Sequence, residues 1–123
     1  MMFARELKEL IQDNIGALTN RYVNQKMSPS AFEKLKIEEA SDTFIMDNVL
    51  DRCLAALIKC GDVLYEEENT LVGIIMSGLL KNNPVLIVMK EDDDRIYIRL
   101  AAREGLISQK SAEKALRRFK ECL

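Results

Sequence analysis

The side chains in this sequence that could carry chemistry are mainly carboxylates. Acidic runs at Glu66–Glu68 and Glu91–Asp94 offer the oxygen ligands that hard cations prefer. Neither run fits the Asp-x-Asp-x-Asp-Gly frame of a calcium loop with its closing glutamate. Acidic runs of this kind are typical of solvated turns, so we expect no metal site from them.

The three cysteines are the second chemical feature of the chain. Cys53 and Cys60 lie seven positions apart in a segment with helical periodicity, which would separate their Cα atoms by about 10 Å, beyond disulfide reach. Together with Cys122 they lack the Cys-x-x-Cys spacing of structural zinc modules. The odd number, without a secretory signal peptide, predicts free thiols in the reducing cytoplasm, packed as small core residues.

The sequence contains no histidine. Histidine is the commonest general base and the commonest metal ligand, so catalysis by Ser-His-Asp or Cys-His sets and zinc binding by His-x-x-x-His are excluded. No glycine-rich phosphate loop is present either. We therefore expect no cofactor and no enzymatic activity. The alternative is an enzyme that uses Asp or Glu in a pocket that the spacing does not reveal.

The composition predicts a single domain over residues 1–123. Its hydrophobic content is 48%, with only five glycines and two prolines, which leaves little room for a linker. The formal net charge of −2 is uneven, with −7 over residues 1–94 and +5 over residues 95–123. Such a polarised chain could pair head to tail or offer its basic end to an anionic partner. The longest apolar run, Leu71–Leu80, is too short and too glycine-broken to span a membrane.

Hydrophobic periodicity predicts a helical part over residues 1–82. Apolar residues at three- and four-residue steps predict a long amphipathic helix over 3–26. A Ser30–Glu33 capping box predicts a short helix over 30–40, and a third, largely buried helix follows over 42–60. The apolar segment 70–81 suits a buried helix or a buried strand, and its length alone favours the helix.

Residues 84–123 are expected to form a β-hairpin followed by a helix. The hairpin spans 85–100, with its turn at Glu91–Asp94 and strict alternation from Arg95 to Leu100. A terminal amphipathic helix is predicted over 108–122. The predicted fold class is therefore α+β, with four to five helices packed on one face of a C-terminal two-stranded hairpin.

A basic surface over residues 95–120 gives the sharpest functional hypothesis. One aromatic and several cations could line a groove that follows phosphates and stacks a base. The candidate nucleic-acid or partner surface is formed by Arg95, Tyr97, Arg99, Arg103, Lys114, Arg117 and Arg118.

Two local resemblances accompany this surface. The run Leu100–Ser108, followed by Ala112 and Leu116, resembles a helix-turn-helix, with one extra residue between glycine and the serine cap. The segment Thr70–Arg103 is similar to the C-terminal nucleic-acid-binding domain of DHH-family phosphoesterases, but lacks the glycine-rich histidine motif of that domain. Neither resemblance assigns the chain to a family.

The sequence thus predicts a small, non-enzymatic protein-interaction, regulatory or assembly-subunit protein in the cytoplasm. Its expected partner is another protein or a second copy of the chain, bound through an exposed strand edge or the first helix. The alternative is a nucleic-acid-binding accessory protein that uses the basic C-terminal hairpin and helix. No membrane partner is expected.

Overall fold

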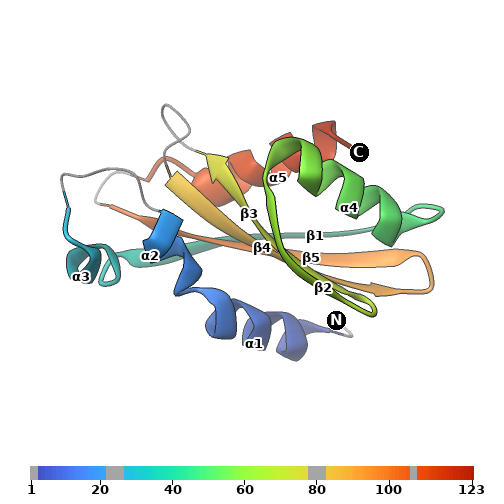
Figure 1. Cartoon of the computed structure of the whole chain (residues 1–123), viewed down its shortest axis with the longest axis horizontal. Coiled ribbons are helices and arrows are strands. Elements are labelled where there is room, and N and C mark those ends of the chain that lie inside the picture. Colours follow the sequence, from blue (N-terminus) through green and yellow to red (C-terminus); the bar gives the residue numbers. More distant parts are fainter. Residues whose placement is uncertain (1–2, 22–26, 78–82, 106–107) are drawn as a thin grey trace.

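The computed structural model describes residues 3–21, 27–77, 83–105 and 108–123. Its centre is a five-stranded antiparallel sheet in the order β1-β5-β4-β3-β2 (Figure 1). The strands are β1 (Lys36–Ile45), β2 (Asp62–Glu67), β3 (Thr70–Ser77), β4 (Asn83–Asp92) and β5 (Arg95–Glu104). The helices are α1 (Ala4–Asn14), α2 (Ala17–Arg21), α3 (Pro29–Phe32), α4 (Val49–Cys60) and α5 (Ser111–Glu121).

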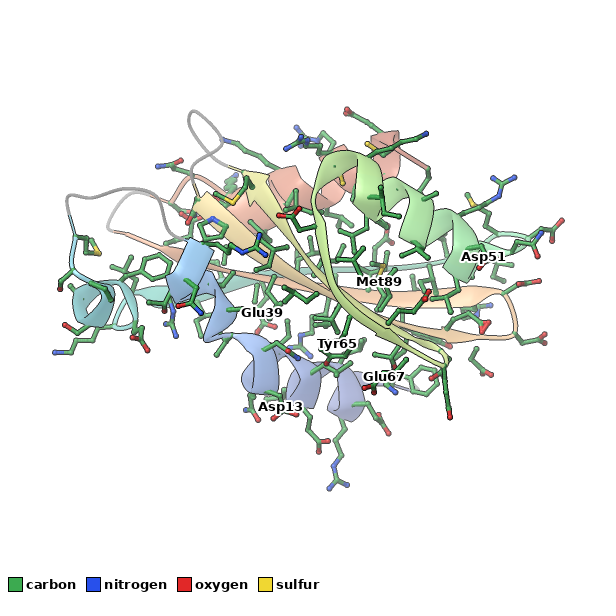
Figure 2. The ribbon with its side chains drawn as sticks, viewed as in Figure 1. Asp13, Glu39, Asp51, Tyr65, Glu67 and Met89 are labelled. Carbon is green, nitrogen blue, oxygen red and sulfur yellow. The ribbon has the colours of Figure 1, made fainter. Side chains whose placement is uncertain are left out.

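Helices cover both faces of the sheet. On the α1 face, α1, α2 and α3 bury Leu7, Leu18 and Phe32 against inward residues of β3, β4 and β5. Figure 1 shows α4 and α5 on the other face, which we call the α5 face. These two helices enclose the larger of the two cores among the described residues. Tyr65 and Met89, labelled in Figure 2, belong to the α1-face and α5-face cores respectively. Because β3 and β4 are covered on both faces, their sequences are almost continuously apolar.

The predicted fold class is wrong, because the sheet is larger and lies between helices. Residues 36–45, assigned by sequence to helices 30–40 and 42–60, form β1, which pairs along its length with β5. Residues 70–77 form β3 rather than a helix, paired with β2 on one side and β4 on the other. The remainder of the segment 70–81 lies outside the described residues.

The hairpin is confirmed but longer than expected. Asp93 and Asp94 join β4 to β5, and both have positive φ, at 52° and 63°. The strand β5 continues through Leu100–Glu104, the stretch predicted to begin a helix-turn-helix, so that prediction is wrong. Positions 106–107 of the same motif lie outside the described residues.

The predicted helix over 3–26 is broken after Asn14. A turn at Ile15–Gly16 separates α1 from α2, and residues 22–26 lie outside the described residues. The Asn14 side chain donates to the Leu10 carbonyl at 2.9 Å and to the Tyr65 hydroxyl at 3.0 Å, which ties the end of α1 to β2. Glycine at position 16 weakens helix continuation at the same point.

The other predicted helices differ in extent. The short helix after Ser28 is limited to α3, where Ser28 accepts a hydrogen bond from the Ala31 N–H, in place of the expected Ser30–Glu33 box. Both α4 and α5 lie inside their predicted ranges. None of the helices in the described ranges combines the length and apolarity required to cross a membrane.

Candidate functional site

The outer edge of β1 is the candidate functional site. The Met46 N–H bonds the Asp94 carbonyl of the β4–β5 turn, so even-numbered residues of β1 direct their backbone groups toward β5. Successive residues of a strand alternate, and the backbone groups of the odd-numbered residues therefore point away from the sheet. These outward residues, which we call the β1 edge, are Ile37, Glu39, Ser41, Thr43 and Ile45. Within the described residues no strand pairs with this edge.

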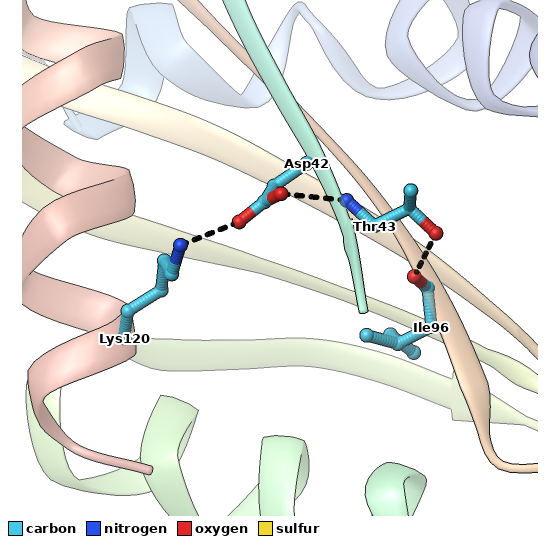
Figure 3. A network of polar contacts seen from close by, with 4 residues as sticks. All are labelled: Asp42, Thr43, Ile96 and Lys120. Carbon is cyan, nitrogen blue, oxygen red and sulfur yellow. Dashed lines mark hydrogen bonds and ion pairs between the residues drawn. The ribbon is translucent and has the colours of Figure 1, made fainter. Parts of the chain in front are cut away.

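Side-chain contacts hold β1 firmly against its neighbours (Figure 3). On the α5 face, Lys120 forms an ion pair with Asp42 at 2.7 Å. The Thr43 hydroxyl donates to the Ile96 carbonyl at 2.8 Å, and the other Asp42 oxygen accepts the outward Thr43 N–H, also at 2.8 Å. These contacts stabilise the position of β1 beside β5 and α5.

Two further polar contacts stabilise the N-terminal half of β1. On the α1 face, Arg99 of β5 pairs with Glu39 at 2.6 Å. Near the start of the strand, the Ser108 hydroxyl donates to Glu38 at 2.7 Å. The two contacts join β1 to residues 60 and 70 positions away in sequence, so they help to hold the first half of the strand against the rest of the fold.

Open hollows flank the middle of the β1 edge on both faces of the sheet. The larger, with a volume of about 600 Å³, lies between β1 and α5. The smaller, of about 220 Å³, lies beside Arg99. Ala40 and Ser41 line both hollows, so the edge is accessible from either side at its centre. The α5 side of the larger hollow is formed by Glu113, Leu116, Arg117, Lys120 and Glu121.

The structure divides the predicted basic surface into two parts. Arg95, Tyr97, Arg99 and Arg103 occupy odd positions of β5 on the α1 face. Lys114, Arg117 and Arg118 belong to α5, on the opposite side of the sheet. The sheet therefore separates the two groups, and they do not line one groove.

Several of these side chains already have structural partners. Arg103 donates to the Leu35 carbonyl at 3.2 Å, and Arg118 donates to the Met76 carbonyl at 2.9 Å. The Tyr97 ring packs edge-on against Phe3, with centroids 5.3 Å apart. Lys114 and Arg117 are exposed on α5, and Arg117 lines the larger hollow.

The acidic runs and the thiols occupy turns and the core. Glu67 and Glu68 border a hollow at the β2–β3 turn that also contains Lys90. In the described ranges no three acidic or cysteine side chains gather as metal ligands would.

Burial raises the pKa of the Cys53 thiol to about 12. Burial, with the adjacent Cys122 thiol, raises that of Cys60 to about 11. Both buried groups are therefore neutral thiols at pH 7.

The residues of the β1 edge are not among those predicted from the sequence. The local signal for a strand would be alternation of apolar and polar side chains. It is weak in β1, because the half-buried even positions include the charged residues Glu38 and Asp42 as well as Ala40 and Phe44. Two of the three large hydrophobic side chains that are exposed among the described residues, Ile37 and Ile45, lie on this edge.

The chain matches no family model, no curated protein and no solved structure.

Proposed function

We propose that this chain is a non-enzymatic interaction protein that binds an extended segment of a protein partner along the β1 edge. The observation that supports the proposal is a ten-residue strand whose outer edge pairs with no other strand in the described part of the chain and is flanked by open hollows. Added strands gain affinity from main-chain hydrogen bonds and specificity from hollows that accept alternate side chains.

The opposite edge of the sheet provides a contrast. The strand β2 is six residues long, and its pairing with β3 is interrupted between Val63 and Tyr65. Short length and irregular pairing are features by which proteins protect an edge from unwanted pairing. The longer β1 shows no shift in its register with β5 and exposes two isoleucines. This difference favours β1 as the binding edge.

The chemistry of the described residues also favours binding over catalysis. The buried Cys53 and Cys60 are poor nucleophiles because their pKa values are raised. The larger hollow is lined by carboxylates and cations together with Leu116, a mixture suited to a peptide. The proposal places the protein in the cytoplasm, where free thiols persist.

Site-specific photo-crosslinking in the native host tests this proposal. A photoreactive amino acid at Ser41 should crosslink to protein, whereas the same group at exposed Ile58 on α4 should not. Crosslinked species that survive nuclease treatment would support a protein partner. Species that nuclease removes would instead support the alternative of a nucleic-acid accessory protein. Equal crosslinking from both positions, or none from Ser41, would contradict the proposal.

A further inference from the structure

We infer that the segment bound along the β1 edge is β1 of a second copy of this chain, paired antiparallel about a two-fold axis at Ser41. This inference rests on the proposed function, since it requires the same open edge. It is carried by the order of residues along β1, because a two-fold pairing makes the strand its own complement.

Backbone geometry limits the registers that two copies can adopt. The outward residues of one copy must face the outward residues of the other, which excludes every register that sets odd positions opposite even ones. Two registers then pair nearly the whole strand, one centred on Ala40 and one on Ser41. Centring on Ala40 sets Glu38 directly opposite Asp42, twice in each dimer. Like charges in direct opposition destabilise a strand pair.

The register centred on Ser41 has no such conflict. It sets Ile37 opposite Ile45 of the partner copy, Glu39 opposite Thr43 and Ser41 opposite itself. The two exposed isoleucines of the strand are thereby buried against each other at both ends of the seam. Their side chains, 39% and 63% exposed in the single copy, gain the cross-strand apolar contact that the monomer lacks.

The surroundings of the edge are compatible with this pairing. A two-fold axis perpendicular to the sheet places α5 of both copies on the same face, so the two larger hollows meet across the seam. The α5 residues there carry both signs of charge, Glu113 and Glu121 beside Arg117 and Lys120, so no single-sign field separates the copies. In the single copy the outward Thr43 N–H bonds Asp42, and in the dimer it would bond the Glu39 carbonyl of the partner copy instead.

Sedimentation equilibrium on the full chain tests the inference. The wild type should form a dimer, and Ile45→Glu should weaken it at least tenfold, because the new carboxylate faces Ile37 of the partner copy. Adding Ile37→Lys to that variant should restore dimerisation, since only this register brings the two introduced charges together. Ile58→Glu, at a side chain 64% exposed on α4, is the matched control and should leave the dimer unchanged.

Cysteine crosslinking gives a second measure that does not depend on apolar contacts. In the proposed register the two Ser41 Cα atoms lie about 5.5 Å apart, within disulfide range. Ser41→Cys should therefore form a disulfide-linked dimer under mild oxidation. Thr43→Cys should not, because the two Thr43 Cα atoms would be about 14 Å apart. Wild-type protein oxidised in the same way shows how much dimer the native cysteines form by themselves. Circular dichroism verifies that each variant is folded.

The outcomes separate this inference from the proposed function. Self-pairing is overturned if the wild type remains monomeric. It is also overturned if Ile45→Glu dimerises as well as Ile58→Glu and Ser41→Cys forms no more disulfide-linked dimer than Thr43→Cys. If such a protein still crosslinks from Ser41 to a different protein, the proposed function stands and only its occupant changes. If Ser41 crosslinks to nothing, both are refuted.

Discussion

Replacing Gly73 by alanine should destabilise the protein, and the sign of the effect tests the corrected fold. A methyl group at this position of β3 would lie 2.5 Å from Cδ2 of Leu57 and 2.6 Å from the Asp62 carbonyl oxygen. Leu57 is a fully buried residue of α4, and the carbonyl belongs to the paired strand β2, so neither can move away easily. If residues 70–81 were a helix, the same change would instead stabilise it by about 1 kcal/mol.

The expected loss is about 3 kcal/mol, the upper end of the range for overpacking a core, because one of the two contacts is with backbone. For a chain of this size that lowers the Tm by roughly 10 °C. Urea unfolding followed by circular dichroism measures the change, with Gly16→Ala as the control. A methyl group at Gly16 would meet nothing within 4 Å, so that variant should be neutral or slightly more stable. A Gly73→Ala protein as stable as the wild type would refute the packing of α4 on β3.

Three further predictions concern the cap of α5, the buried thiols and the hairpin turn. Buried Glu104 accepts the Ser111 N–H at 2.8 Å and the Gln109 N–H at 3.3 Å, in the place of the missing side-chain cap at Lys110. Glu104→Gln should therefore cost about 1–2 kcal/mol in urea unfolding, whereas exposed Glu113→Gln should cost less than about 0.5 kcal/mol; equal losses would contradict this role. The raised pKa values of Cys53 and Cys60 stabilise the fold below the ordinary thiol pKa of 9.0, and that stabilisation is lost as the pH rises through 9 toward 11–12. At pH 10 each thiol should lower the free energy of unfolding by about 1 kcal/mol, so the stability of Cys53→Ala should fall less steeply between pH 8 and pH 10 than that of the wild type. Parallel curves for the two proteins would contradict the raised pKa of Cys53. Asp94→Gly should stabilise the protein by about 0.5–1 kcal/mol because φ is 63° at this turn position, and a loss of stability would count against the turn geometry.

The sequence was informative where local patterns coincide with tertiary contacts. Apolar residues predict both α4 and α5, and α5 has a clear stripe ending in Phe119. The prediction that the third helix is largely buried is wrong, because α4 buries one side and exposes the other, including Ile58. The alternation from Ile96 to Leu100 survives in β5 because one face packs on the α5-side core. The run in β3 was ambiguous for a physical reason, since helices cover both faces and remove the alternation that distinguishes a strand from a buried helix.

The candidate site could not be located in this way. The predicted basic residues of β5 share the α1 face of the sheet, whereas those of α5 lie on the opposite face. Their proximity in sequence does not show that the sheet separates the two groups. The β1 edge carries little charge pattern and no motif. Its accessibility depends on which strand becomes the edge of the sheet, a property of the topology rather than of any segment.

The failure to predict β1 and its suitability as a binding edge have one physical origin. The strand contains Lys36, Glu38, Glu39, Ala40 and Asp42, residues that are depleted in strands, so local propensity does not favour the extended form. What holds it extended is pairing with β5, about 60 positions away, and the ion pairs from Arg99 and Lys120. These contacts act on the inner edge and the two faces, and no described strand pairs with the outer edge. A second copy of β1 would supply the missing hydrogen bonds and apolar contacts on that edge, so we expect β1 to be more protected from hydrogen exchange at dimer-forming concentrations than at high dilution.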